Sequence, residues 1–346
     1  MVVLPHEGAL AGDLRAAGVD VLVRPLAVLR RELVHPVGLA GLGARIAGDF
    51  GALAGLVRAH DAALVHSNTS VILGGALAAR RASVPHVWHV REIYESFGRW
   101  WPAYRRLLVS AAALPCVSEA ARAQFGAEPR ARVIPDGIAP GSPARERAGR
   151  EAARARWRLE PEAFVCAVLG RLSDWKGQDI LIRAIVDERL RAVNAVALIA
   201  GEAWRGDTRR RELEELARSS GAADRVRFTG FVPDPAPLYA ASDVVVVPST
   251  RPDPLPNAAL EAAAAGCCVV ASDHGGLPEI IADRDTGRLF EPGDHGALAR
   301  VLAELARDPD DRLRLGRAAA ADIPRRYSAG LLIDRVQALY DDVLSR

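Results

Sequence analysis

Short runs of uninterrupted apolar residues, each followed by a helix-like segment, constrain this fold more than any other feature of the sequence. Runs that are apolar throughout, instead of alternating with polar residues, are typical of strands that are covered on both faces. Alternation of such strands with helices is typical of parallel βαβ units. The predicted strands lie at residues 2–4, 20–23, 63–66, 84–90, 115–117, 164–170, 195–201, 225–230, 243–248 and 267–272.

The runs fall into two series, and a chain of 346 residues is long for a single core. Between the series, residues 135–158 are rich in glycine and proline and then heavily charged, which is typical of a linker. We therefore predict an α/β protein with two doubly wound parallel-sheet domains, over 1–150 and 151–326. Residues 327–346 carry an apolar stripe at helical spacing and predict a separate C-terminal helix that can pack back on the first domain.

The composition is that of an ordinary globular protein, with 50% hydrophobic and 25% charged residues and a net charge of +2, so no nucleic-acid partner is expected. The four cysteines show no CxxC spacing and three lie in apolar runs, which favours buried free thiols in a reducing compartment. The sequence shows no signal peptide and no apolar run of transmembrane length. A cytoplasmic location is therefore expected.

Lys176 is the only lysine among the 45 lysine and arginine residues of the chain. It lies in GRLSDWKG, residues 170–177, between a predicted strand and a helix-like segment. An ammonium group is a compact charge with three donors, which suits a crowded anion such as a diphosphate. Helix N-termini at strand ends are also where open α/β sheets bind anions. Arg171 and Lys176 are therefore predicted to converge on a negative group; the alternative is chance survival of one lysine in an arginine-rich chain.

A second strand-to-helix junction lies at residues 249–266. Pro256 ahead of it and Gly266 behind it predict a helix that begins near Asn257. Ala258 in the first turn leaves room for a phosphate to reach backbone N–H groups. This junction is therefore a second candidate for anion binding.

The same junction carries two carboxylates, Asp253 in the turn and Glu261 in the helix. Taken singly, Asp253 is a turn former before proline and Glu261 a surface helix residue. Together with Arg171 and Lys176 they indicate a site whose carboxylates accept hydrogen bonds from several hydroxyls. A sugar or a ribose requires that chemistry.

Several further short motifs occur along the chain in a fixed order. They are HSNTS (66–70), WHVRE (88–92), VSEAAR (117–122), VIPDGI (133–138), GRLSDWKG (170–177), GFVPD (230–234), SDVVVVPS (242–249), the acid-x7-Glu spacing (253–261) and HGGLPE (274–279). This series, which covers nearly the whole chain, resembles the retaining glycosyltransferases of family four. These are GT-B enzymes related to glycogen synthase and sucrose synthase, so the resemblance implies two Rossmann-like domains facing across a cleft.

The resemblance implies roles for single residues. It implies that Arg171 and Lys176 bind the diphosphate of a nucleotide sugar and that Glu261 holds the ribose hydroxyls. It further implies that Asp253 approaches the donor sugar and that His89, from the first domain, faces that sugar.

The resemblance also implies nucleotide contacts from Val232, Asn257 and Ala258. The implied reaction is transfer of a hexosyl group from a UDP- or GDP-sugar to an acceptor hydroxyl, with retention and with neither a metal nor a cofactor. The arginine-rich composition suggests a GC-rich bacterium, and hence an acceptor from cell-envelope polysaccharide, glycolipid or natural-product synthesis. A GT-B phosphorylase or epimerase stays open; a phosphorylase needs a pyridoxal-phosphate lysine, for which Lys176 is the sole candidate.

Two departures from the family pattern matter. Asp253 stands where glutamate is usual, which leaves the donor sugar open. Family members also carry a strand and a glycine-rich loop about 30–35 residues upstream of residues 2–4. A first sheet without that unit lacks an interior strand, so a nucleotide-sugar-binding module with weak or no transfer is the alternative function. We expect residues 1–346 to bind donor but transfer poorly, and upstream sequence to restore transfer.

Three further features are open to more than one interpretation. Residues 98–108, GRWWPAYRRLL, mix aromatic and arginine side chains, which allows a peripheral membrane contact but is better explained by packing or by an acceptor-binding wall. His66 either touches the acceptor or is a satisfied core histidine. His274 is a candidate for lining the donor pocket.

Overall fold

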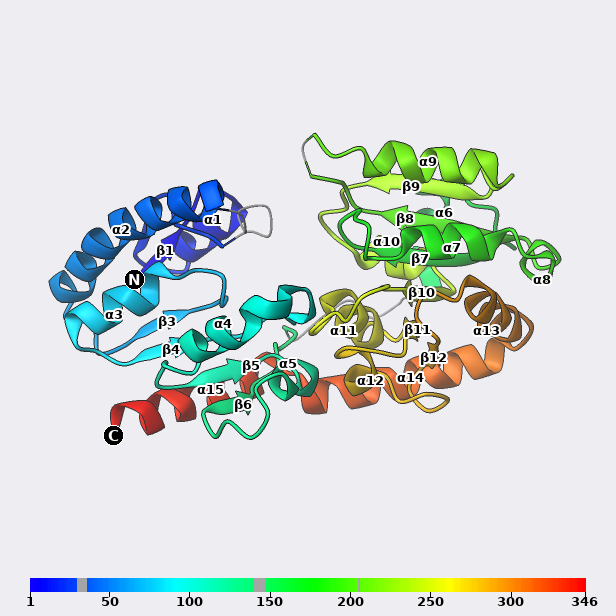
Figure 1. The fold of residues 1–346 in the computed structure, drawn as a ribbon. Helices are drawn as coiled ribbons and strands as arrows, with labels where there is room; N and C mark the ends of the chain where they lie inside the picture. The colour runs from blue at the N-terminus through cyan, green and yellow to red at the C-terminus, as the bar shows by residue number, and fades with distance from the viewer. Residues whose placement is uncertain (30–35, 140–146, 205) are drawn as a thin grey trace. The chain divides into compact units, whose positions relative to one another are not determined.

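The computed structural model describes residues 1–29, 36–139, 147–204 and 206–346 (Figure 1). Two compact units are present: Met1–Val117, Arg122–Val133 and Val336–Arg346 form the first, and Ser118–Ala121 and Ile134–Arg335 form the second. The N-terminal part of the first unit thus ends at Val133, ahead of the expected linker, of which residues 140–146 lie outside the described part of the chain. The segment after Val133 belongs to the second unit because the Ile138 N–H donates to the Tyr327 carbonyl oxygen, at 2.7 Å.

The first unit is built from short strands and the helices between them. Its elements are β1 (Val2–Leu4), α1 (Ala9–Ala16), β2 (Val21–Val23), α2 (Pro36–Ala59), β3 (Val65–Ser67), α3 (Gly74–Ala82), β4 (His86–Trp88), the 3-10 helix η2 (Glu95–Trp100), α4 (Trp101–Leu108), β5 (Leu114–Cys116), β6 (Ala131–Val133) and the end of α15 (Ala329–Leu344). Helix α5 (Glu119–Ala123) lies where the two units divide.

The parallel sheet predicted for the first unit is present in pieces. Strand β1 pairs with β2, β3 with β4 and β5 with β6, each pair in parallel, and single parallel bridges connect β4 to β5. Among the described residues, no ladder joins β1 or β2 to β3.

The second unit alternates strands and helices throughout. Its elements are α6 (Arg147–Arg156), β7 (Phe164–Leu169), α7 (Gln178–Ile185), α8 (Glu188–Arg191), β8 (Ala195–Ala200), α9 (Arg209–Ser219), β9 (Val226–Gly230), α10 (Ala236–Ala241), β10 (Val244–Val247), α11 (Asn257–Ala264), β11 (Cys268–Ser272), α12 (Leu277–Ile280), β12 (Arg288–Phe290), α13 (His295–Arg307) and α14 (Pro309–Arg326).

Its six strands form one parallel sheet in the order β12-β11-β10-β7-β8-β9. From β7 the chain proceeds outward to β8 and β9, and then returns to the other side of β7 to form β10. The direction of winding therefore reverses between β7 and β10. Open α/β sheets bind ligands at such a reversal, beyond the carboxyl ends of the two strands.

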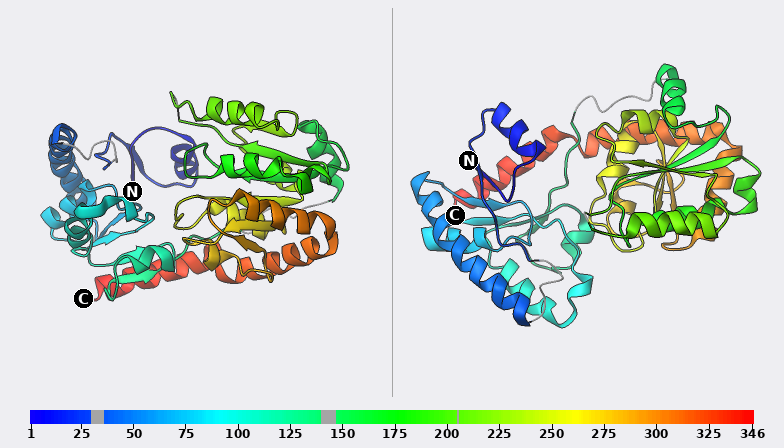
Figure 2. Two further views of the ribbon diagram at one scale, coloured as in Figure 1. Left: turned by 45° about the vertical axis from the view of Figure 1, so that its right-hand side comes forward. Right: turned by 90° about the horizontal axis from the view of Figure 1, so that it is seen from above.

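Both faces of this sheet are covered by helices (Figure 2). Successive residues of β7 point to opposite faces, and Val165 and Cys166 are both fully buried. Cys166 packs in a core that includes Leu181 of α7 and Leu302 of α13. The uninterrupted apolar runs thus predicted these strands correctly. Each predicted strand is present, with its ends shifted by no more than two residues. The strands β6 and β12 were not predicted.

The four cysteines, Cys116, Cys166, Cys267 and Cys268, are buried and free, as their spacing predicted. Burial raises the pKa of the Cys268 thiol to about 12, so this side chain stays neutral in the core. In the described part of the chain, no helix combines the length and the apolar character needed to cross a bilayer.

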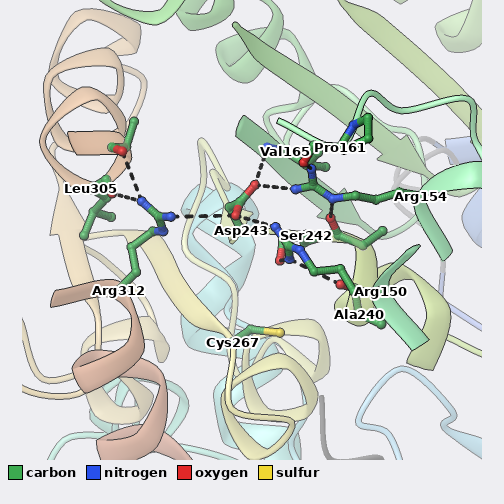
Figure 3. A network of polar contacts seen from close by, with 12 residues as sticks. Arg150, Arg154, Pro161, Val165, Ala240, Ser242, Asp243, Cys267, Leu305 and Arg312 are labelled. Atoms are coloured by element: carbon green, nitrogen blue, oxygen red, sulfur yellow. Dashed lines mark hydrogen bonds and ion pairs between the residues drawn. The ribbon is translucent and has the colours of Figure 1, made fainter. Parts of the chain in front are cut away.

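A buried carboxylate, Asp243, fixes the amino-terminal end of β10 (Figure 3). Its oxygens accept the Val165 N–H at 2.7 Å and the guanidinium groups of Arg150 at 2.6 Å and Arg154 at 2.8 Å. Arg312 of α14 lies farther away, at 3.8 Å. Buried charges are tolerated when they are paired and hydrogen-bonded in this way. The cluster thus attaches α6 and α14 to the sheet.

We expect Asp243→Asn to lower the free energy of unfolding by about 3–5 kcal/mol, because the change leaves the buried Arg154 guanidinium without its carboxylate. The control Glu215→Gln removes an exposed ion pair with Arg218, in which both side chains are 62% exposed, and should cost less than about 1 kcal/mol. Urea unfolding of both variants measures the two losses. If both variants lost a similar amount of unfolding free energy, the Asp243 cluster would not be what attaches α6 and α14 to the sheet.

Candidate functional site

Two loops meet at the reversal point of the second sheet. Residues 170–177 follow β7, and the segment that begins at Pro248 follows β10. Gly177 has a φ of +71°, and a Cβ built there would lie 1.7 Å from the Pro248 carbonyl oxygen, so the loops touch through their backbones and only glycine fits. The Thr250 N–H also donates to the Trp175 carbonyl oxygen, at 2.8 Å. The two strand-to-helix junctions that the sequence singled out are therefore neighbours.

The lone lysine and the turn aspartate form an ion pair at this meeting point. Lys176 Nζ lies 2.6 Å from Asp253 Oδ2, and the side chains are 24% and 7% exposed, respectively. The ammonium also lies 4.3 Å from the centroid of the Trp175 ring, within the range of a cation–π contact. Because an ammonium has three donors, it can hold Asp253 and an anionic ligand at once.

Asp253 is itself held by the turn of the HGGLPE motif. The Gly276 N–H donates to the Asp253 carbonyl oxygen at 2.8 Å. Gly275 has a φ of +61°, and a Cβ there would lie 2.5 Å from the same oxygen. His274 Nε2 lies 2.8 Å from the Ser249 carbonyl oxygen, so this histidine bridges the ends of β10 and β11. A role for His274 in lining a donor pocket stays a prediction.

Arg171 lies on the same loop as Lys176, but its guanidinium stacks on an aromatic ring. The guanidinium carbon lies 4.9 Å from the centroid of Trp204, which follows β8 and is 68% exposed. The Arg171 carbonyl oxygen accepts a hydrogen bond from Gln178 Nε2 at 3.0 Å, which fixes the start of the loop. The predicted convergence of Arg171 and Lys176 on one anion stays a prediction. Trp204 belongs to no motif that the sequence analysis singled out.

Helix α11 begins at Asn257, as predicted. Its N-cap residue is Pro256, and no side chain caps the first turn, which includes Ala258. The first N–H groups of a helix have no partner within the helix, and they are the donors that bind anions. The helix start is therefore suited to a phosphate.

Glu261, one turn into this helix, is held by a residue that the sequence analysis missed. Its Oε2 accepts a hydrogen bond from the Tyr239 hydroxyl at 3.1 Å. Burial raises the pKa of Glu261, and the bond from Tyr239 offsets part of that rise. Tyr239 lies on α10, is 1% exposed, and belongs to no motif that would have pointed to it.

Val232 is buried, with 9% of its surface exposed. The ring that projects from this segment is that of Phe231, which is 69% exposed. The nucleotide contact predicted for Val232 is not tested by this geometry.

His89 belongs to the first unit. It follows β4, is 3% exposed, and donates its backbone N–H to the Ser67 carbonyl oxygen at 2.9 Å. Its ring stacks on that of His66, with centroids 5.6 Å apart and an interplanar angle of 23°. The structure therefore brings these two histidines together, close to the carboxyl ends of β3 and β4.

Packing accounts for much of residues 98–108. Trp101 stacks on Tyr94 with ring centroids 5.2 Å apart, and the buried Tyr104 donates its hydroxyl to the Ser70 carbonyl oxygen. Trp100 and Leu107 are 49% and 38% exposed. A membrane contact through this segment stays a prediction that rests on these two side chains. Within the described residues, no group of three or more histidine, cysteine or acidic side chains is arranged to hold a metal ion.

Comparison with known proteins assigns this combination of fold and site to a family. Residues 149–322 match the family model described as glycosyl transferases group 1, and residues 8–141 match that of glycosyltransferase family 4. The chain belongs to the group 1 glycosyltransferases. The first match alone covers half of the chain and includes the whole of the reversal-point site.

Curated relatives carry the name D-inositol 3-phosphate glycosyltransferase. Those of Streptomyces avermitilis and Streptomyces coelicolor are 40% and 39% identical over 179 and 198 residues, which is 50% and 55% of this chain. The matched part spans 38% and 43% of these relatives, less than half of their length.

Several solved structures share the fold. The structure of Anabaena Alr3699/HepE in complex with UDP-glucose has a TM-score of 0.83 at 25% identity and covers 99% of this chain and 91% of that chain. The sucrose-phosphate synthase of Thermosynechococcus elongatus has a TM-score of 0.78 at 21% identity, over 97% of this chain and 92% of that chain, and shows likeness of fold alone. These neighbours confirm the predicted GT-B fold class.

We expect Lys176→Arg to fold normally but to bind UDP or GDP about tenfold more weakly, which corresponds to about 1.4 kcal/mol. The planar guanidinium cannot occupy the place of a compact ammonium between Asp253 and a diphosphate. Isothermal titration calorimetry measures the affinities, and Arg218→Lys, on an exposed helix face, serves as a control that keeps the total charge. Unchanged affinity in Lys176→Arg would support chance survival of this lysine.

Proposed function

We propose that this chain is a retaining, metal-independent glycosyltransferase that moves a hexosyl group from a UDP- or GDP-sugar to an acceptor hydroxyl. The observation that carries the proposal is the Lys176–Asp253 ion pair at the reversal point of the second sheet. The pair supports the proposal because a cation suited to a diphosphate lies directly beside a carboxylate suited to sugar hydroxyls. The HepE structures in complex with UDP and with UDP-glucose support a nucleotide-sugar donor.

The first chemical requirement is stabilisation of the departing diphosphate, which gains negative charge as its bond to the anomeric carbon breaks. In the proposed reaction, Lys176 and Arg171 supply positive charge. The first N–H groups of α11, at Asn257 and Ala258, donate hydrogen bonds to a phosphate oxygen. With these groups in place the leaving group needs no metal ion.

Retention is proposed to follow a front-face route. The acceptor oxygen bonds to the anomeric carbon on the face from which the diphosphate departs. The electron pair of the broken bond stays on the phosphate oxygen, which takes the acceptor proton. Asp253 is not the nucleophile in this scheme, because its carboxylate is already paired with Lys176. It instead orients the lysine and accepts hydrogen bonds from the sugar, while Glu261 accepts them from the ribose.

The acceptor is proposed to be a hydroxyl compound of cell-envelope polysaccharide, glycolipid or natural-product synthesis, bound on the first unit near His89. The names of the curated relatives make a cyclitol phosphate the first acceptor to test.

A cytoplasmic location with a peripheral membrane contact through residues 98–108 belongs to the same proposal, supported by the exposed Trp100 beside Arg99. Loss of binding to anionic vesicles in Trp100→Ala would test that contact.

UDP or GDP is expected to stabilise the protein equally in EDTA and in magnesium or manganese, because the proposed diphosphate site consists of protein cations and N–H groups. At ~100 times its dissociation constant, a nucleotide adds about 2.7 kcal/mol to the free energy of unfolding, which thermal unfolding detects readily. A nucleoside monophosphate should shift the melting temperature less. Stabilisation that requires a divalent metal would contradict the metal-independent site.

Nucleotide affinity is expected to fall on acidification as Glu261 takes up a proton. Its pKa is raised by burial, so the carboxylate that accepts ribose hydrogen bonds is present above that pKa and is lost as the pH falls through it. Tyr239→Phe removes a hydrogen bond that lowers this pKa, so the loss should begin at a higher pH. Glu261→Gln should bind nucleotide weakly at every pH and should not show the fall in affinity that comes from protonation of Glu261. Protonation of the diphosphate itself affects all variants equally. A parent-like pH profile in Glu261→Gln would remove Glu261 from the site.

A further inference from the structure

Three ring side chains meet in the first unit, and the proposed function refers to only one of them, His89, near which the acceptor is proposed to bind. Tyr340 on α15 and His66 on β3 are 274 residues apart in the sequence, yet the Tyr340 hydroxyl lies 2.6 Å from His66 Nδ1. The two rings meet edge to face, with centroids 5.7 Å apart and an interplanar angle of 88°. The His66 ring also stacks on the ring of His89.

Tyr340 is held in place independently of His66. Leu339 and Val343, on the same end of α15, are 3% and 5% exposed. Between them on the helix, Asp342 Oδ2 lies 2.8 Å from Arg132 Nη1 of β6. The tyrosine hydroxyl is therefore presented to His66 from an anchored helix.

The protonation states of the pair make their hydrogen bond directional. Burial, with a smaller contribution from Arg91, lowers the pKa of His66 to about 4, so the imidazole is neutral at physiological pH. His86 and His89 are the other titratable rings beside it. Burial also raises the pKa of Tyr340, which keeps its hydroxyl protonated.

A phenol donates more readily than a neutral imidazole, so the Tyr340 hydroxyl donates to Nδ1 and the proton of the ring resides on Nε2. His66 Nε2 is buried, and among the described residues it has no hydrogen-bond partner. The ring thus presents one N–H donor whose direction Tyr340 sets.

We propose that Tyr340 is a positioning residue for the acceptor side of the reaction: its hydroxyl selects the Nε2–H tautomer of His66 and fixes the ring that stacks on His89. His66 in turn holds the ring of His89, beside which the acceptor is proposed to bind. This assignment rests on the proposed function, which places the acceptor near His89. The competing explanation is that Tyr340 only fastens α15 to the first unit, as the Arg132–Asp342 pair does.

Steady-state kinetics separate positioning from fastening. Tyr340→Phe keeps the ring and removes only the hydroxyl, and it should lower kcat for transfer about tenfold. The affinity for UDP should stay unchanged, because the predicted nucleotide contacts Arg171, Lys176 and Glu261 lie in the second unit. The matched control Asp342→Asn removes the neighbouring anchor of the same helix and should leave kcat unchanged. A fastening role predicts equal effects of the two variants.

A double-mutant cycle tests whether Tyr340 acts through His66. In the His66→Ala background, adding Tyr340→Phe should change kcat by less than about twofold. A full tenfold effect in that background would overturn the proposal. If the parent enzyme is active, a kcat of Tyr340→Phe equal to that of the parent would also overturn the proposal.

A measurement that needs no activity keeps the inference distinct from the proposed function. Nitrogen-15 NMR of the ring nitrogens of the full chain, with His66 assigned by its absence in His66→Ala, should show the Nε2–H tautomer in the parent and a mixture in Tyr340→Phe. An unchanged tautomer would overturn the role of Tyr340. If the parent neither binds nucleotide nor transfers sugar, the proposed function fails, and the NMR result still decides the Tyr340–His66 link.

Discussion

The second unit depends on complete burial of one strand, β10, whose four valines leave no face for water. Such a strand is stable only in the middle of a sheet that is covered on both sides. At its amino-terminal end, Asp243 is buried because Arg150, Arg154 and the Val165 N–H satisfy it. At its carboxyl end, the Pro248 carbonyl oxygen packs against Gly177. The anchoring charges and the candidate ligand-binding charges are thus separated by the length of one strand, about 13 Å, so either set can change without disturbing the other.

The sequence predicted the strands well wherever burial was uninterrupted. The two strands it did not predict, β6 and β12, have three residues each and contain Arg132 and Arg288. An arginine within so short a run removes the apolar signal. Arg288 is 7% exposed and is tolerated because Glu304 of α13 pairs with its guanidinium at 2.9 Å. That partner lies 16 residues away in the sequence and becomes a neighbour only when α13 folds back on the sheet.

The sequence also predicted which residues carry the chemistry, but not how they face one another. Lys176 and Asp253 are 77 residues apart, and their contact follows from the adjacency of β7 and β10, which spacing alone does not reveal. Motifs gave no indication of Trp204 or Tyr239, since an aromatic residue after a strand or within a helix is most often part of a core. Both owe their position beside a candidate site residue to the order of strands in the sheet.

The same arrangement occurs within each unit taken by itself: several candidate polar groups are held by partners from other parts of the chain. Asp253 holds Lys176, Tyr239 holds Glu261, and Tyr340 holds His66. Restricting a long side chain costs up to about 2 kcal/mol of rotamer entropy, and here that loss occurs during folding, before any ligand arrives. A site arranged in this way aligns its charges and donors in advance, so more of the interaction energy is available where charge develops in the reaction. The same arrangement explains why removing one hydroxyl from such a partner should alter a rate or a protonation state while leaving the fold intact.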